Sequence, residues 1–315
     1  MVAFGHVDGG DTGVTVAYLG KDGMRASVDV RGGGPGTRET DLLEPHNTVD
    51  RVHAIVLAGG SAFGLAAADG AMRELAASEI GFAVADIRIP IVPAAVIFDL
   101  LVGPNRPSAK DGARATASAM TGDDMRIGSV GAGCGASAGK LRGGFGRHSV
   151  RVNEAGAVKS EQPRFKVSAA VVANPVGEVV DADTGLLYGD PHAPGVDPDR
   201  FRALPHPFAA QLNTTIGVIY TDAPLSKAQL KRLAMCGHDG IARAVRPAHL
   251  PMDGDSLFAV TEAASAEPEV VSTDTLAALC AGAADAVCGA IVSAIRAAGS
   301  GQGASVPPTY SELVR

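Results

Sequence analysis

The sequence predicts an α+β protein, because apolar strand-like runs and longer helical segments both occur along the chain. The stretches Lys166–Ala173 and Thr214–Thr221 are continuous apolar or β-branched runs, which is typical of buried strands. The stretches Leu225–Ala244 and Thr275–Ala298 are longer and have helical character. With 315 residues, the chain is long enough for one large domain or two of average size.

Composition excludes several classes of function. The net charge of −7 argues against a nucleic-acid partner. The four cysteines lack metal-ligand spacing, so we expect buried thiols, no structural disulfide and a reducing cytoplasm (Cys134, Cys236, Cys280 and Cys288). We see no signal peptide, and the apolar stretches are broken by Pro, Asp or Gly before the ~20 residues of a membrane span. The protein is therefore expected to be soluble.

The first elements are two strands, Val14–Leu19 and Ala26–Val30, joined by a Gly-Lys-Asp-Gly turn in the manner of a hairpin. The glycine-dense loop Arg31–Thr40 follows them. Such a loop can bring backbone close to a ligand, but surface glycine loops are common.

A short strand, His53–Leu57, leads through a glycine turn into the helix Leu65–Ala77, and Ser61 lies in this turn. A strand, tight turn and helix with a serine resemble a nucleophile elbow, G-x-S-x-G. The second glycine is missing, because Phe63 occupies its position and Gly64 comes one residue late. We therefore expect Ser61 to cap the helix or contact substrate, and not to act as a nucleophile.

The next segments are a buried strand within Arg88–Leu101, a helix at Lys110–Met120 and a glycine loop from Gly128 to Lys140. The loop fails the Walker pattern, because Cys134 stands where the first glycine belongs and Leu141 follows the lysine. It also lacks the strand and helix that a dinucleotide fingerprint requires. What remains is a loop that presents one lysine, Lys140.

The strand Lys166–Ala173 ends at Asn174, where the following proline enforces extended backbone. The simplest interpretation of Asn174 is an ordinary Asn-Pro turn. The proline-rich stretch Gly185–Phe208 is predicted to be a loop and is the best candidate for a mobile or processing segment.

An Asn213–Thr214 step stands at the mouth of the strand that follows. If this bond breaks, Thr214 becomes an N-terminal residue whose hydroxyl is a nucleophile and whose α-amine is the base. A free α-amine has a pKa of roughly 7.7–8.0, which suits a general base near neutral pH. Taken alone, the dipeptide is more simply the start of an ordinary strand.

After the helix Leu225–Ala244, with Ser226 as its expected N-cap, comes an Asp253-Gly254-Asp255 turn before another strand. In extended backbone the two aspartates project to the same face, which suggests a divalent cation, an acid/base pair or only a polar turn. The final helix is Thr275–Ala298, and the tail after Gly299 is expected to be loose.

Six segments occur in the order seen in one family: Arg31–Thr37, Ser61–Gly64, Ala138–Lys140, Ala173–Pro175, Asn213–Val218 and Asp253–Asp255. On these segments the chain resembles the self-processing L-aminopeptidase/D-esterase family, which includes the β-peptidyl aminopeptidases. The Asn-Thr step and the Asp-Gly-Asp turn are most similar to the branch of the nylon-oligomer (6-aminohexanoate-oligomer) endohydrolases.

The resemblance implies an α/β/β/α sandwich of the type shared with ornithine acetyltransferase, related to the N-terminal nucleophile hydrolases. It implies a single catalytic domain over 1–315, cleaved into an α-chain, 1–213, and a β-chain, 214–315, which stay associated. A homo-oligomer, tetramer or larger, is also implied. Relatives carry a further leading segment, so the first strand and one edge of the sheet are in question here.

The resemblance also assigns roles to residues. Thr214 is the nucleophile, Asp253 and Asp255 orient its amine and hydroxyl, and Lys140 hydrogen-bonds near it and offsets the two carboxylates. Asn174 donates its amide to the oxyanion. Candidate substrate contacts are Ser61, Phe63 and Phe98. Phe98 stands where some relatives have a tyrosine that helps to bind the oxyanion, so that donor is missing.

The expected activity is hydrolysis of amide bonds in small peptides or peptide-like oligomers through an acyl-enzyme, without a metal or cofactor. L-peptides, D-amino-acid amides, β-peptides and ω-amino-acid oligomers all remain open as substrates. Two alternatives also remain: an acyltransferase of the ornithine acetyltransferase type, and a non-catalytic binding protein on the same fold.

Overall fold

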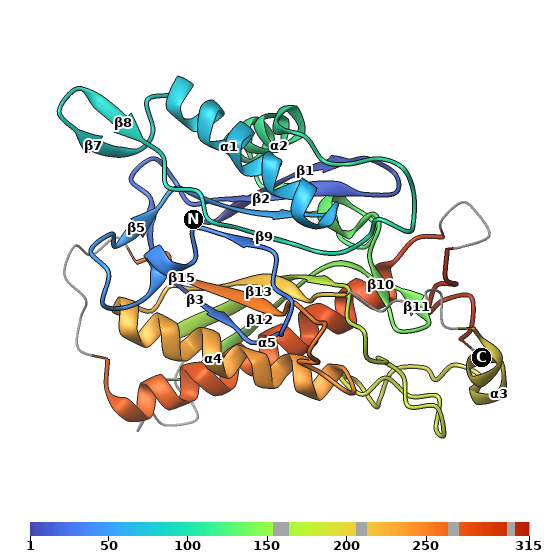
Figure 1. The fold of residues 1–315 in the computed structure, drawn as a ribbon. Coiled ribbons are helices and arrows are strands. Elements are labelled where there is room, and N and C mark those ends of the chain that lie inside the picture. The colour runs from blue at the N-terminus through green and yellow to red at the C-terminus, as the bar shows by residue number, and fades with distance from the viewer. Residues whose placement is uncertain (154–163, 206–212, 264–270, 301–305, 315) are drawn as a thin grey trace.

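Two β-sheets lie face to face, and a pair of helices covers the outer face of each (Figure 1). The computed structural model describes residues 1–153, 164–205, 213–263, 271–300 and 306–314. One pair of helices is α1 (Ala66–Ala77) and α2 (Ala109–Thr121), and the other is α4 (Lys227–Ala244) and α5 (Thr273–Ala297). This arrangement is the α/β/β/α sandwich, and the predicted fold class is confirmed.

The first sheet has five strands in the order β1-β2-β6-β9-β4. Their bounds are Ala3–Asp8 for β1, Gly13–Tyr18 for β2, Thr37–Arg38 for β4, Ala54–Ala58 for β6 and Ala94–Val96 for β9. The edge strand β1, which the sequence left in question, is present and pairs antiparallel with β2. The pairing of β6 with β9 is parallel, so both strands end at the same edge of the sheet, next to Ser61 and Phe98.

The second sheet has six strands in the order β12-β13-β14-β15-β3-β5. Their bounds are Met24–Val30 for β3, Arg51–Val52 for β5, Gly144–Val152 for β12, Phe165–Ala173 for β13, Ile216–Thr221 for β14 and Ser256–Thr261 for β15. Strand β14 lies between antiparallel β13 and parallel β15. The starts of β14 and β15 and the end of β13 therefore meet at one edge, which brings together Asn174, Thr214 and Asp255.

The remaining elements are short. They are the hairpins β7–β8 (Phe82–Val84 and Ile87–Ile89) and β10–β11 (Ser137–Ala138 and Leu141–Arg142), helix α3 (Pro198–Ala203), and 3-10 turns at Asp41–Leu43, Ser61–Leu65 and Gly131–Gly133. The hairpin β7–β8 projects from the body beside α1 (Figure 1). Residues of the predicted Arg88–Leu101 strand are thus divided between this exposed hairpin and the buried strand β9.

Apolar side chains fill the space between the layers. Between the sheets, Phe4, Phe145 and Phe258 are fully buried together with aliphatic residues from both sheets. A second cluster lies between α4, α5 and the six-stranded sheet, and a third lies beneath α1 and α2. Burial of this apolar surface is the main force that holds the layers together.

Helix α5 is long and apolar enough to cross a membrane, by length and composition alone, with a mean hydropathy of 1.9. The expectation that apolar stretches are too interrupted for this was therefore too strict, because single Gly and Asp residues do not lower the mean enough. However, 67% of the most apolar 18-residue part of the helix is buried inside the protein, where α5 packs against β12, β13 and α4. The helix packs as a core element of the sandwich.

The expected hairpin of the first two strands is wrong. The turn itself forms, with the N–H of Gly23 donating to the carbonyl of Gly20 at 3.1 Å. However, β2 pairs with β1 and β6, whereas β3 pairs with β15 and β5. The turn carries the chain from one sheet to the other, and local turn residues cannot distinguish these two outcomes.

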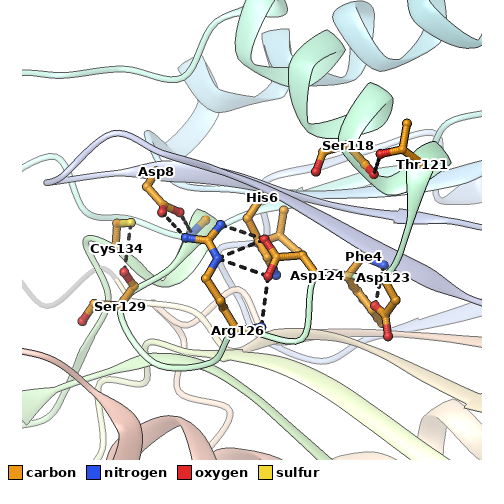
Figure 2. Close-up of polar contacts among 12 residues, drawn as sticks. Phe4, His6, Asp8, Ser118, Thr121, Asp123, Asp124, Arg126, Ser129 and Cys134 are labelled. Atoms are coloured by element: carbon orange, nitrogen blue, oxygen red, sulfur yellow. Dashed lines mark hydrogen bonds and ion pairs between the residues drawn. The ribbon is translucent and has the colours of Figure 1, made fainter.

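The segment between α2 and the glycine loop is tied to β1 by an ion pair (Figure 2). Arg126 lies 2.6 Å from a carboxylate oxygen of Asp8 and 2.7 Å from one of Asp124. Asp8 also accepts the main-chain N–H of Gly131 at 2.6 Å. Burial lowers the pKa of the neighbouring His6 to about 4, so this ring is neutral near pH 7.

Two loop predictions are partly corrected. The stretch Gly185–Phe208 is mainly irregular, as predicted, but it includes α3, and residues 206–212 lie outside the described residues. The tail is not loose over residues 306–314, because Tyr310 and Leu313 are buried and Tyr310 donates its hydroxyl hydrogen to the carbonyl of Pro194. The four cysteines are free thiols, with Cys280 and Cys288 buried in α5 as expected.

Candidate active site

Thr214 lies two residues before the first residue of the buried strand β14 and is itself only 5% exposed. Its Oγ1 donates a hydrogen bond to the carbonyl oxygen of Asn213 at 2.5 Å. Its main-chain N–H donates to the carbonyl oxygen of Asn174 at 2.7 Å. The hydroxyl is therefore held against the peptide bond that joins Asn213 to Thr214.

The carbonyl of Asn213 is also held by the Asp-Gly-Asp turn that precedes β15. The main-chain N–H of Gly254 donates to it at 3.2 Å, and the side-chain amide of Asn213 donates to the carbonyl of Pro175 at 2.9 Å. A Cβ on Gly254 would lie 2.9 Å from Thr214 Oγ1 and 2.9 Å from the carbonyl oxygen of Gly34. Only glycine allows the backbone to approach the threonine this closely.

Asp253 and Asp255 are both 1% exposed, and their carboxylates accept backbone N–H groups. Asp255 Oδ1 accepts the N–H of Thr215 at 2.7 Å. Asp253 accepts the N–H groups of Val176 at 3.3 Å and Leu250 at 2.9 Å. In the described part of the chain, no hydrogen bond joins either carboxylate to the hydroxyl of Thr214. The two side chains hold the backbone around the threonine.

Burial, and then the charge of Asp255, raise the pKa of Asp253 to about 6. The Asp253 carboxyl is thus ionised above about pH 6 and takes up a proton below it. A cation site would need the two carboxylates to direct free oxygen lone pairs to one point. Here the carboxylate oxygens face N–H donors, and the described residues contain no group of three potential metal ligands.

Asn174 is fully buried at the end of β13. Its Oδ1 accepts the N–H of Ser137 at 2.8 Å, and its Nδ2 donates to the carbonyl of Phe98 at 3.2 Å. These two bonds fix the orientation of the amide, and the second Nδ2 hydrogen has no assigned acceptor among them. The structure thus brings Asn174, Asn213, Thr214 and the Asp-Gly-Asp turn together, as the sequence predicted.

Lys140 is the exception. Its ammonium group donates to the carbonyl of Arg202 at 3.3 Å and lies 5.5 Å from the ring centroid of Phe201. Its main-chain N–H donates to Glu178 at 3.1 Å. The tight β10–β11 turn directs the side chain toward α3, so the expected hydrogen bond to Thr214 is not present among the described residues.

A pocket of about 230 Å³ opens onto Thr214. Its walls are residues 34–36, Ser61 and Ala62, residues 96–98, Asn213 and Met252. Ser61 and Phe98 therefore lie where substrate contacts were predicted. Phe63 does not line the pocket and is 66% exposed.

Ser61 does not cap α1, contrary to expectation. The first turn begins at Gly60 without a side-chain cap, and Ser61 has a positive φ of 51°. Its N–H instead donates to the carbonyl of Ile97 at 2.9 Å. The residue that the sequence analysis missed is His249, whose Nδ1 lies 2.7 Å from Asp255 Oδ2. Its position in a proline-bounded loop gives no signal in the sequence.

Comparison with known proteins adds to this geometry. Residues 2–306 match the peptidase family S58. An uncharacterized aminopeptidase of Mycobacterium tuberculosis (strain ATCC 25618 / H37Rv) is 42% identical over 322 residues, covering 96% of this chain and 89% of the relative. A 6-aminohexanoate-oligomer endohydrolase of Kocuria sp. (strain KY2) is 34% identical over 273 residues, covering 82% and 72%.

Solved structures agree on the architecture. A beta-aminopeptidase of Burkholderia sp. superposes with a TM-score of 0.76 at 25% identity, covering 99% of this chain and 90% of that one. The L-aminopeptidase D-Ala-esterase/amidase of Ochrobactrum anthropi, described as a variant of the Ntn hydrolase fold, gives a TM-score of 0.75 at 22% identity, covering 99% and 89%. The latter similarity supports the fold alone.

Proposed function

The chain belongs to peptidase family S58 and hydrolyses amide bonds, and we propose that Thr214 becomes its nucleophile when the Asn213–Thr214 bond is cleaved by the chain itself. The observation that carries this proposal is the 2.5 Å hydrogen bond from Thr214 Oγ1 to the carbonyl of Asn213. The relatives described above are aminopeptidases and endohydrolases, which supports hydrolysis over acyl transfer or a non-catalytic role.

In the first reaction, Thr214 Oγ1 attacks the carbonyl carbon of Asn213 and loses its proton. The N–H of Gly254, 3.2 Å from the carbonyl oxygen, would stabilise the negative charge that develops there. The C–N bond then breaks, the threonine nitrogen takes up a proton, and an ester joins Asn213 to Oγ1. Water hydrolyses this ester, which leaves a carboxylate on Asn213 and a free amine on Thr214.

In the cleaved enzyme, the α-amine of Thr214 would act as the general base for its own hydroxyl. The carbonyl of Asn174, which accepts the Thr214 N–H at 2.7 Å, would orient this amine. Oγ1 attacks the substrate amide, the leaving amine departs with a proton, and water releases the acid from the acyl-enzyme. The second hydrogen of Asn174 Nδ2 is the proposed donor to the substrate oxyanion.

The substrate class follows from the pocket and from the names of the relatives. Small peptides, amino-acid amides and amide oligomers fit a pocket of about 230 Å³ walled by Pro35, Val96, Phe98 and Met252. We further propose that the α- and β-chains stay associated after cleavage, because β13 and β14 are neighbours in one sheet. We likewise propose a homo-oligomer, which rests on the family resemblance. A cytoplasmic location is also proposed and rests on the four free cysteines.

A matched pair of variants tests the nucleophile. Thr214→Val removes the hydroxyl and keeps the side-chain shape, so the chain should stay uncleaved and amide hydrolysis should fall by about a thousandfold or more. Thr215→Val removes a buried hydroxyl that has no hydrogen-bond partner within the described ranges of the chain, so both activities should persist. Denaturing mass spectrometry and release of free acid from a dipeptide amide provide the readouts. Cleavage at the same bond in Thr214→Val would contradict the proposal.

A further inference from the structure

His249 is bonded to Asp255 twice. Its Nδ1 lies 2.7 Å from Asp255 Oδ2, and its main-chain N–H donates to the same oxygen at 3.2 Å. Nδ1 carries a hydrogen in this pair, because an ionised carboxylate can only accept. The residue holds a positive φ of 59°, a strained conformation for a side chain of this size.

The other oxygen of the same carboxylate reaches the backbone beside the nucleophile. Asp255 Oδ1 accepts the N–H of Thr215 at 2.7 Å, and the N–H of Ser256 donates to the carbonyl of Thr215 at 3.0 Å. A single carboxylate thus connects the His249 loop to the residue after Thr214. With both oxygens occupied, the carboxylate cannot rotate without breaking a bond.

The imidazole of His249 is itself held in place. Its ring packs edge-on against His238, with ring centroids 5.0 Å apart. His238 is fully buried, and its Nε2 lies 3.0 Å from the carbonyl oxygen of Asp29. Arg31 and Lys231 pair with the Asp29 carboxylate at 2.8 and 3.6 Å, so charged groups fix the far end of this contact.

We propose that His249 is a positioning residue: it orients the Asp255 carboxylate, which fixes the Thr215 backbone and so keeps the Thr214 hydroxyl on its target carbonyl. The inference rests on the proposed role of Thr214. His249 does not line the substrate pocket, so it acts on the reaction step and not on substrate binding. Misplacement of a reacting group by about 1 Å can cost on the order of a hundredfold in rate.

Two substitutions separate the hydrogen bond from the backbone conformation. Asparagine and glycine both accept a positive φ, but only asparagine carries an N–H donor near the position of Nδ1. We expect His249→Gly to slow self-cleavage and to lower kcat by about ten- to a hundredfold with little change in KM. His249→Asn should restore both rates to within about threefold of the unsubstituted protein. His192→Gly, in an exposed loop, is the matched control and should leave both rates unchanged.

The outcomes distinguish the two proposals. If the unsubstituted protein neither cleaves itself nor hydrolyses amides, the function of Thr214 fails. If it does both and His249→Gly matches it, the role of His249 alone is overturned. Equal losses in the asparagine and glycine variants would also overturn it, because a purely structural role predicts no rescue. Should the glycine variant not fold, a loss beyond about tenfold in folded His249→Asn would contradict the inference.

Discussion

Two hydroxyl groups, those of Thr214 and Ser61, face the same pocket from different sheets, yet their surroundings differ. Ser61 follows a strand end and has a positive φ of 51°, which resembles the strained turn of a nucleophile elbow. Thr214 precedes a strand in an irregular segment and is not among the residues with a positive φ. On local conformation alone, Ser61 would be the better candidate.

The hydrogen-bonding groups around each hydroxyl instead favour Thr214 over Ser61 as the nucleophile. The hydroxyl of Thr214 bonds to the Asn213 carbonyl, which in turn accepts the N–H of Gly254. In the turn of Ser61, the Gly60 N–H donates to Asp99 at 2.6 Å, and the Ser61 N–H donates to Ile97. Both backbone N–H groups of that turn are thus used for anchoring. The groups arranged around the target carbonyl therefore identify the nucleophile better than the local backbone conformation does.

Gly254→Ala should give the largest effect of the remaining tests. The added methyl group would lie 2.9 Å from Thr214 Oγ1 and would displace the N–H that faces the Asn213 carbonyl. Loss of one such donor costs on the order of a hundredfold or more in rate, so we expect self-cleavage to slow by that factor. A pulse-chase time course of cleavage measures it.

Gly122→Ala serves as the control for this variant, because a Cβ there meets nothing within 4 Å. Equal cleavage rates in Gly254→Ala and Gly122→Ala would show that the Gly254 N–H does not assist cleavage. Only the hydrogen bond from Thr214 Oγ1 to the Asn213 carbonyl would then distinguish the surroundings of Thr214 from those of Ser61.

The pH dependence of amide hydrolysis should report the protonation of Asp253, one of the two carboxylates near Thr214. Burial and the charge of Asp255 raise the pKa of Asp253 to about 6, so the charged form is lost as the pH falls below that value. Protonation of the Thr214 amine should lower kcat/KM for a small amide about tenfold per pH unit below pH ~8, and below pH 6 we expect a steeper limb of about a hundredfold per unit. In Asp253→Asn this steeper limb should disappear, with a lower rate at neutral pH.

A steeper limb below pH 6 that persists unchanged in Asp253→Asn would assign that titration to another group. Asp99 is the natural comparison, because burial also raises its pKa to about 6 and it anchors the turn of Ser61. Loss of the limb in Asp99→Asn would shift attention to the Ser61 side of the pocket.

Ser61→Ala should give the smallest effect. The Ser61 hydroxyl takes part in no hydrogen bond assigned within the described residues, and its N–H bond to Ile97 survives the change. We expect kcat to change by less than about threefold, because no group that forms or breaks a bond is removed. A loss of two orders of magnitude, measured on the same amide substrate, would make Ser61 a second catalytic residue.

The sequence predicted much of the fold and of the site, for identifiable reasons. Strands such as β13 and β14 and helices such as α4, with its Ser226 capping box, are determined by local pattern. The site residues were assigned from the family resemblance, and the parallel pairing of β14 with β15 explains why Thr214 and the Asp-Gly-Asp turn meet at one edge.

The errors occurred where distant contacts decide the outcome. The sheet to which β3 belongs depends on its pairing with β15, and the direction of Lys140 depends on the carbonyl of Arg202 and the ring of Phe201. The role of His249 depends on its contact with Asp255 across a loop. None of these contacts leaves a local pattern in the sequence.

Whether the chain cleaves itself between Asn213 and Thr214 is decided by the intact mass of freshly purified protein under denaturing conditions, together with N-terminal sequencing. Self-cleavage should give two species, one ending at Asn213 and one beginning with Thr214, whose masses sum to the mass of the full chain plus one water. A single full-length species that stays intact on long incubation would contradict self-cleavage.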